Sequence, residues 1–304
     1  MGLALIFFAS YPIAAVVTGT LGQDSGGSTS GGSLGTLLPL LLVCLVDAAV
    51  LTIVLVHGRW WGWRLVAAAF VILFGAETFL SQMETFYFSL SLGLPTGTVL
   101  RFVIAGAVRA LLIAPAAVLL VGRMSPIEST YRSVSSLPGK PRTWWRGLAI
   151  PIAFLAIVYA VVYIFFGYFV AWQSGEVRAF YSGSTEIQPF LSHIRDRIVH
   201  GSPGLVPFQL LRGVLWAGLA RLVVVMTGGS GLRHALLTGI LFGCLVSMPC
   251  VVPNPYLPTG VRMVHFIELL SSMLLFGAMA GWLLARSSRQ GQNLGLSRVT
   301  PSTT

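Results

Sequence analysis

The stretch LLPLLLVCLVDAAVLTIVLV, from Leu37 to Val56, contains a single charged residue, Asp47. About 20 mainly apolar residues are enough for an α-helix to cross the hydrocarbon core of a bilayer. A run of this length and composition would be costly to expose to water on the surface of a soluble domain. The stretch therefore predicts a transmembrane helix, and the chain on either side repeats the pattern.

The composition extends this prediction to the whole chain. Hydrophobic residues make up 55% of the 304 residues and charged residues only 9%, and the mean hydropathy is +0.84. Roughly a quarter of the residues of a water-soluble domain are charged, so this chain has too little polar surface to be one. The net charge is +10, but the arginines fall mostly between apolar runs, where they indicate topology. The expected partner is the lipid bilayer, and nucleic acid is set aside.

Eight apolar runs are long enough to cross a membrane. They cover residues 2–22, 35–57, 64–91, 97–122, 147–172, 206–226, 235–252 and 262–285. The predicted fold is all-α, a polytopic transmembrane bundle of about eight helices. It forms one integral membrane domain, residues 1–285, followed by a disordered cytoplasmic tail, residues 286–304. No Lys or Arg precedes the first run, so we expect it to remain as a helix, with cleavage as the alternative.

The distribution of basic residues predicts the orientation. They crowd the second, fourth and sixth connections and the tail: Arg59, Arg64, Arg123, Arg132, Lys140, Arg142, Arg146, Arg233, Arg286, Arg289 and Arg298. The connections at 23–34 and 92–96 contain none. Because cytoplasmic loops collect Lys and Arg, the loop 123–146 and both termini are expected in the cytoplasm. The strong use of Arg over Lys fits a bacterial protein, and hence the bacterial inner membrane.

The outer connection, residues 173–205, contains an amphipathic pattern. Five apolar residues fall within a narrow arc at 100° per residue: Ile187, Phe190, Leu191, Ile194 and Ile198. Polar residues, including His193, cover the rest of the turn. We expect a helix near 187–199 that lies on the outer membrane surface or caps the bundle, with an irregular loop as the alternative.

Three shorter patterns concern local structure. The Gly/Ser stretch Gly22–Ser33 predicts a flexible outer loop. The order Ser-Pro-Ile-Glu at 125–128 is that of a capping box and predicts a short cytoplasmic helix. The pairs Gly239-x-x-x-Gly243 and Gly277-x-x-x-Gly281 predict close approach of the last two helices.

Ionisable residues inside the apolar runs are the candidate functional residues. Each costs about 2.5 to 3.5 kcal/mol at the centre of a membrane helix, so it persists only where it is paired, hydrated or useful. Besides Asp47, eight of them form the candidate polar cluster: Glu77, Glu84, Arg101, Arg109, Arg212, Arg262, His265 and Glu268.

The predicted topology arranges these charges by depth. Counting along antiparallel neighbours places Glu77 level with Arg109 and Glu84 level with Arg101, which predicts two stacked ion pairs. In the last run, Arg262, His265, Glu268 and Ser272 form one polar stripe that Arg212 could meet. We expect six of the residues to converge in the outer half of the bundle: Glu84, Arg101, Arg212, Arg262, His265 and Glu268.

The chemistry of these residues stays general. His265-x-x-Glu268 has a spacing that suits a shared metal or a proton relay. A metal site needs three or four ligands, however, and no second His lies at transmembrane depth. We therefore favour a His–Glu pair stabilised by a neighbouring arginine, and expect no metal or cofactor. No P-loop, G-x-S-x-G elbow or H-E-x-x-H motif is present, so no catalytic residue is assigned.

Three motifs in the second half of the chain carry a family resemblance. They are YFVAWQ at 168–173, PNPYLP at 253–258 and VRMVHFIE at 261–268. Together they resemble an uncharacterised family of bacterial multi-pass membrane proteins, and Glu84, within QMET at 82–85, fits the same pattern. The resemblance implies a topology and a bacterial origin, and no activity.

Three functions remain open. A permease or channel-like protein for a small solute or a proton would line a cavity with the buried charges. A membrane-embedded enzyme would act on a lipid-linked substrate at the outer leaflet, with Glu84, His265 or Glu268 as acid or base. A non-catalytic assembly or sensory subunit would use the charges as structural contacts. We favour the permease, because the charges are buried and the outer helix could act as a lid, and we place the assembly subunit before the enzyme. The depth of the cavity discriminates them, since a transporter needs polar residues through the full depth of the bundle and an outer-leaflet enzyme needs them only near one surface. The oligomeric state is not predicted.

Overall fold

A computed structural model describes residues 1–19, 34–89, 94–95, 97–125, 146–201 and 204–296. In these ranges the chain is helical, without a β-strand, as predicted. Eight helical segments match the eight apolar runs: α1 Gly2–Thr18, α2 Leu34–Val56, α3 Gly62–Leu73 with α4 Leu80–Tyr87, α5 Thr98–Leu120, α7 Arg146–Phe169, α10 Leu205–Met226, α11 Gly231–Ser247 and α12 Thr259–Leu296. Seven of them are long and apolar enough to cross a membrane; α1 is shorter.

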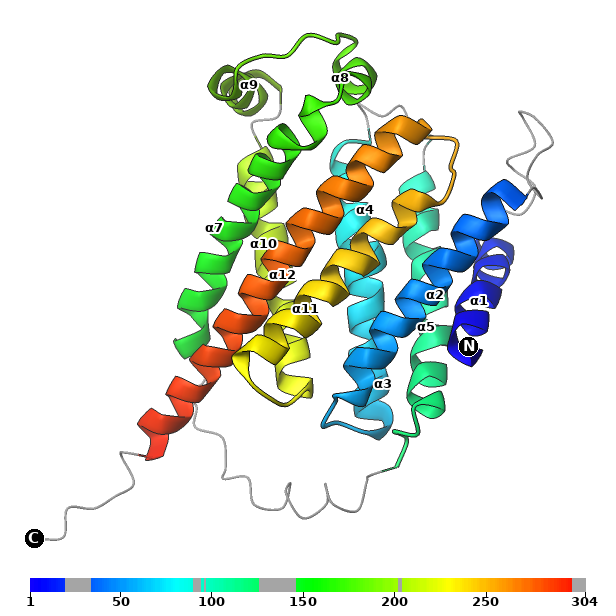
Figure 1. Ribbon diagram of the computed structural model, residues 1–304, viewed down its shortest axis with the longest axis vertical. Helices are drawn as coiled ribbons and strands as arrows, with labels where there is room; N and C mark the ends of the chain where they lie inside the picture. The colour runs from blue at the N-terminus through cyan, green and yellow to red at the C-terminus, as the bar shows by residue number, and fades with distance from the viewer. Residues whose placement is uncertain (20–33, 90–93, 96, 126–145, 202–203, 297–304) are drawn as a thin grey trace, which may run out of the picture.

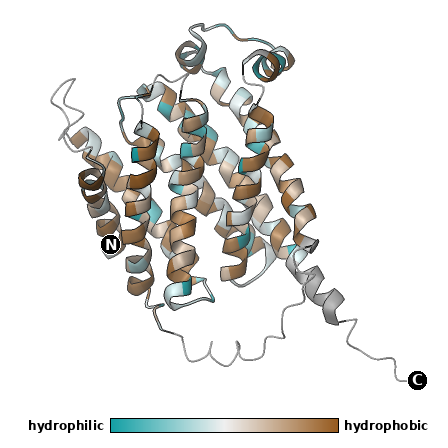
Figure 2. Cartoon of the chain, turned by 180° about the vertical axis from the view of Figure 1, so that it is seen from behind, coloured by the Kyte–Doolittle hydropathy of each residue, from teal (hydrophilic) through white to brown (hydrophobic). Residues whose placement is uncertain are grey.

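The helices pack side by side with parallel or antiparallel axes (Figure 1). At one edge, α1 packs against α2 and α5; at the other, α7 packs against α10 and α12. Large apolar side chains fill the interior, including Phe7, Trp216, Phe242 and Phe276, none more than 1% exposed. Apolar residues also cover the sides of the bundle (Figure 2), and Ile150 there is 79% exposed. Such a lateral surface suits lipid rather than water.

Two short helices, α8 (Gly175–Ser182) and α9 (Phe190–Asp196), cover one end of the bundle (Figure 1). We call this the capped end. Ser174 begins α8 by accepting a hydrogen bond from the Val177 N–H at 3.4 Å, and Gly183 ends it with φ of 70°. A π-helical turn, Arg197–Gly201, continues α9.

The cap differs in detail from the amphipathic helix predicted near 187–199. Helix α9 begins at Phe190, leaving Ile187 outside, and α8 was not predicted. Leu191 from the predicted apolar arc is 79% exposed, whereas His193 from the predicted polar face is 8% exposed. His193 is buried because its ring lies against Trp172 and Tyr168, with ring centroids 4.6 and 5.3 Å apart. His193 therefore packs against the bundle, although the pattern places it among the polar residues of this segment.

The opposite end carries the connections rich in arginine, and we call it the basic end. There the Arg59 N–H donates to Met226 O at 2.7 Å and the Gly62 N–H to Arg123 O at 2.8 Å. Gly2 lies beside Leu120 at this end, and α12 also ends there (Figure 1). Both described ends of the chain thus lie at the basic end of the bundle.

Close packing of α11 on α12 follows the predicted glycine pairs. A Cβ added to Gly277 would lie 2.7 Å from Thr238 O, and one added to Gly239 would lie 3.0 Å from Leu274 O. The predicted close approach is confirmed. Helix α12 then continues to Leu296, within the segment predicted to be a disordered tail. The predictions for Gly22–Ser33 and for most of the 123–146 loop, including the helix after Ser125, fall outside the described residues.

Candidate functional site

A π-helical turn, η1 (Phe74–Phe79), joins α3 to α4 and carries Glu77. We call this third helical segment, from α3 to α4, the third crossing. Single π-turns inside α-helices recur at functional sites because the extra residue re-aims the side chains that follow. Two acidic residues lie in this crossing: Glu77 within the turn and Glu84 in α4, after the turn. Each of them forms an ion pair with an arginine from a different helix.

Glu84 pairs with Arg212 of α10. The Arg212 Nη1 donates to Glu84 Oε2 at 2.8 Å and to Gln209 Oε1 at 3.0 Å, and Nη2 donates to Leu80 O at 3.0 Å. The Arg212 side chain is 4% exposed and that of Glu84 29%. Charge-assisted bonds of this length offset much of the cost of burying the guanidinium. The partner of Glu84 is thus Arg212 rather than the predicted Arg101, which is exposed at the start of α5.

His265 and Glu268 form the predicted pair on α12. The His265 Nδ1 lies 2.7 Å from Glu268 Oε2, and Nε2 lies 3.1 Å from the hydroxyl of Tyr181 in α8. Because an ionised carboxylate only accepts hydrogen bonds, this geometry assigns a proton to Nδ1. The second ring nitrogen, Nε2, accepts from the Tyr181 hydroxyl in the neutral imidazole and donates to the Tyr181 oxygen in the imidazolium. Burial raises the pKa of Tyr181, and the carboxylates of Glu84 and Glu268 raise it further, which keeps the phenol protonated.

These two pairs belong to one group beneath the cap. Tyr163 of α7 lies close enough to Glu84 and Arg212 to interact electrostatically with both. Glu84 in turn acts electrostatically on His265. We call this group the capped-end cluster: Glu84, Tyr163, Tyr181, Arg212, His265 and Glu268. It draws on α4, α7, α8, α10 and α12, and the π-turn residue Arg197 lies close enough to act on both tyrosines.

Arg262 has a different role from the one predicted. Its Nη1 donates to the carbonyls of Cys250 at 3.0 Å and Val251 at 3.3 Å, and its Nη2 donates to Thr259 Oγ1 at 3.1 Å. It therefore stabilises the connection between α11 and α12 by satisfying carbonyls at the end of the short helix Met248–Val251. Of the six residues predicted to converge, Glu84, Arg212, His265 and Glu268 belong to the capped-end cluster. The hydrogen bonds of Arg262 are to the connection between α11 and α12, and Arg101 is exposed at the start of α5.

A second group lies near the middle of the bundle. Arg109 Nη1 donates to Glu77 Oε1 at 2.7 Å, and the two side chains are 11% and 7% exposed. This is the ion pair predicted from depth, and it is confirmed. The Arg109 Nε donates to Ser10 Oγ at 3.4 Å, and its guanidinium carbon lies 3.7 Å from the ring centroid of Tyr11. Helix α1 thus contributes to a site that the sequence predicted from two helices only.

Asp47 of α2 completes this mid-depth cluster, which we define as Ser10, Tyr11, Asp47, Glu77 and Arg109. Its side chain is fully buried and lies in the electrostatic field of Glu77 and Arg109. Neither carboxylate oxygen has a hydrogen-bond partner in the described part of the chain. The predicted cluster does not include Asp47, although Asp47 is the only charged residue of its apolar run. That isolation is the feature of the sequence that points to a buried functional group.

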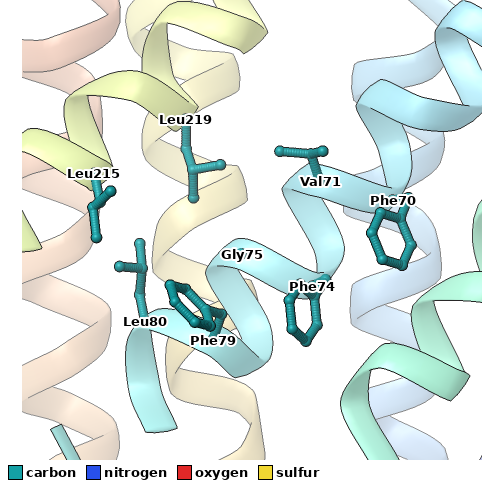
Figure 3. Close-up of a pocket in the computed structure, with 8 residues that line it drawn as sticks. All are labelled: Phe70, Val71, Phe74, Gly75, Phe79, Leu80, Leu215 and Leu219. Carbon is teal, nitrogen blue, oxygen red and sulfur yellow. The ribbon is translucent and has the colours of Figure 1, made fainter. Parts of the chain in front are cut away.

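Two grooves have no charged residue in their lining. The first, about 180 Å³, is lined by apolar side chains of the third crossing and of α10, with Gly75 at its floor opposite Leu219 (Figure 3). The second, near the capped end, is lined by Phe86, Tyr87, Ser89 and Phe208. The apolar walls of the first groove suit acyl chains or packing and supply no acid or base. Among the described residues, no group of three or more His, Cys, Asp or Glu could hold a metal ion.

The chain matches no family model, no curated protein and no solved structure. Its function is therefore inferred from the two clusters alone. The capped-end cluster places an imidazole, two carboxylates and two phenols near one surface. The mid-depth cluster places two carboxylates and one guanidinium in the interior. Both sets can take up and release protons, and neither offers a nucleophile with a partnering base.

Proposed function

We propose that this multi-pass membrane protein is a permease that moves protons, alone or together with a small solute. The observation that carries the proposal is the placement of titratable groups at two successive depths of the third crossing. Glu84 lies toward the capped end and Glu77 near the middle, each beside its own arginine. A charge buried in a membrane helix is costly and marks ion or substrate pathways.

The distribution of charge favours this function over the alternatives. An enzyme acting at one leaflet needs its polar groups near one surface, as in the capped-end cluster, and gains nothing from the mid-depth cluster. An assembly subunit with structural charges would pair them one to one. The mid-depth cluster instead holds two carboxylates, Asp47 and Glu77, for a single guanidinium, and leaves the oxygens of Asp47 without partners among the described residues. Such a surplus acid is suited to carrying a proton.

The proposed orientation places the capped end outside a bacterial inner membrane and both termini in the cytoplasm. The support is the excess of arginine at the basic end. Trp60 and Trp282 there stack with Arg64 and Arg286 at 3.8 and 3.7 Å, as expected for indoles at the headgroup level. In this orientation His265 and the phenol of Tyr181, which hydrogen-bonds it, lie toward the side from which protons would enter.

The test is proton flux into phospholipid vesicles that contain the purified full-length chain and a trapped pH-sensitive dye. We expect an imposed pH gradient to collapse faster than in protein-free vesicles, with a potassium ionophore clamping the potential. The Glu84→Gln variant should slow the collapse, and Glu186→Gln, which changes an exposed carboxylate outside both clusters, should not. Equal rates with and without the wild-type protein would contradict the proposal.

A further inference from the structure

The charge balance of the mid-depth cluster points to a specific proton site. The groups that act on Asp47 come from five elements: Tyr11 of α1, Cys44 of α2 itself, Glu77 of η1, Arg109 of α5 and Cys244 of α11. Only Arg109 among these five brings a positive charge, and its Nη1 is bonded to Glu77 at 2.7 Å. If Asp47 and Glu77 were both ionised, the cluster would carry one uncompensated negative charge in the membrane interior.

We infer that Asp47 holds a proton in the resting protein and is the proton-binding site of the permease. A neutral carboxylic acid removes the surplus charge, and a fully buried group favours its uncharged form. The geometry agrees, because an ionised carboxylate would be expected to draw hydrogen-bond donors, yet both Asp47 oxygens lack a partner among the described residues. The role of Asp47 in transport rests on the proposed function, whereas the protonation of Asp47 is independent of it.

The unpaired donor of Arg109 shows how the site would respond to proton release. Its Nη2 is buried and also has no hydrogen-bond partner in the described part of the chain. When the Asp47 O–H gives up its proton to water or to a neighbouring base, the carboxylate left behind becomes a strong acceptor for this N–H. Asp47 and Glu77 then compete for one guanidinium. A proton at Asp47 therefore biases Arg109 toward Glu77, and its loss draws Arg109 toward α2.

A proton fits the cluster better than sodium does. Sodium would add a full positive charge beside the Arg109 guanidinium, and the two would repel each other strongly in a medium of low polarity. A proton instead forms a covalent O–H bond on the carboxylate itself and leaves no second cation. Ser10 is also poorly placed to ligate a metal ion, since its Oγ already accepts from Arg109 and donates to Phe7 O at 2.6 Å.

Infrared spectroscopy of the purified chain in lipid nanodiscs tests the protonation directly. We expect the carbonyl stretch of a protonated carboxylic acid at neutral pH in the wild type and in Asp196→Asn, which changes a surface carboxylate paired with Arg195. Asp47→Asn should lack the band. Its absence from the wild type, or its persistence in Asp47→Asn, would overturn the inference.

Two further measurements guard against a folding artefact and against sodium. Asp47→Asn replaces a neutral acid with a neutral amide of the same shape, so its melting temperature should equal that of the wild type. A large loss of stability would mean that Asp47 is ionised in the native protein, and would overturn the inference. So would disappearance of the band when sodium chloride replaces choline chloride, because sodium would then occupy the site.

Proton flux into vesicles separates this inference from the proposed function. If the wild type and Asp196→Asn conduct protons and Asp47→Asn does not, both stand. Undiminished flux in Asp47→Asn overturns the role of Asp47 and leaves the permease. A protonated Asp47 in a wild type that conducts no protons overturns the permease and leaves the proton site.

Discussion

The Glu84–Arg212 ion pair should behave as a coupled unit. Neutralising Glu84 alone leaves the Arg212 guanidinium, 4% exposed, with only neutral partners. We expect Glu84→Gln to lower the free energy of unfolding by about 2 to 3 kcal/mol, toward the lower range for buried pairs because Glu84 is partly exposed. The double variant Glu84→Gln/Arg212→Met should recover part of this loss. Denaturant unfolding in detergent would measure both.

The exposed pair Arg195–Asp196 serves as the matched control. Its side chains are 71% and 40% exposed, and solvent-exposed ion pairs contribute at most about 1 kcal/mol. Asp196→Asn should therefore change stability little. Strictly additive losses for Glu84 and Arg212 would contradict the coupling of that pair.

The partner of Glu84 shows which part of a buried charge network can be read from sequence. Counting residues gives the depth of a side chain, and depth correctly paired Glu77 with Arg109. It does not give the direction of the side chain around the helix. The π-turn Phe74–Phe79 adds one residue, about 100° of rotation, between the start of the crossing and α4. Nothing in the local sequence predicts this π-turn, so the sequence did not predict Arg212 as the partner of Glu84 and favoured Arg101 instead.

The packing of α11 against α12 depends on glycines at their contact. In Gly277→Ala the new Cβ would lie 2.7 Å from Thr238 O and 2.9 Å from Gly239 Cα, so the helices must separate. We expect the free energy of unfolding to fall by about 1 to 3 kcal/mol, as for overpacked interiors.

Gly218→Ala, in α10, is the control, because its Cβ would meet no atom within 4 Å. Alanine favours helix over glycine, so that variant should be as stable as the wild type or more so. Equal melting temperatures for both variants would contradict the packing argument.

Docking of α9 on the bundle should weaken in acid. Burial lowers the pKa of His193, and the nearby Arg197 lowers it further, so the folded state binds this proton less readily than the unfolded state does. The stabilisation is complete above the ordinary histidine pKa of about 6.5 and declines as the pH falls from there toward the lowered value. The protection factors of the 190–196 amides, which correct for the slower intrinsic exchange in acid, should fall over that interval.

His193→Phe provides the control for this pH dependence. Phenylalanine keeps an aromatic ring against Trp172 and Tyr168 but cannot take up a proton. Its α9 amides should exchange slowly at both ends of the pH interval. An unchanged acid response in this variant would assign the effect to another group.

Across the molecule, the sequence predicted the helices far better than the site. Each crossing is specified locally, since about 20 apolar residues in a row have few alternatives to a membrane helix. The clusters depend on which helices become neighbours, and that is decided by side-chain packing over the whole bundle. Helix α1 illustrates the difference: its apolar run was recognised, while the contacts of Ser10 and Tyr11 with Arg109 came from its position beside α5.

The orientation of the whole bundle is testable with reporter fusions. The basic end gathers more arginines than the capped end, where Arg178, Arg195 and Arg197 are offset by Glu176, Glu186 and Asp196. Basic residues near membrane helices are retained in the cytoplasm. We therefore expect a fluorescent protein fused after the C-terminus to fold and fluoresce in the cytoplasm. A phosphatase that is active only outside should be active when inserted at Gly183, in the turn after α8. Because α8 and the end of α12 lie at opposite ends of the bundle (Figure 1), the two reporters must lie on opposite sides of the membrane. The reverse pattern would invert the proposed orientation, and activity on the same side for both would contradict the bundle itself.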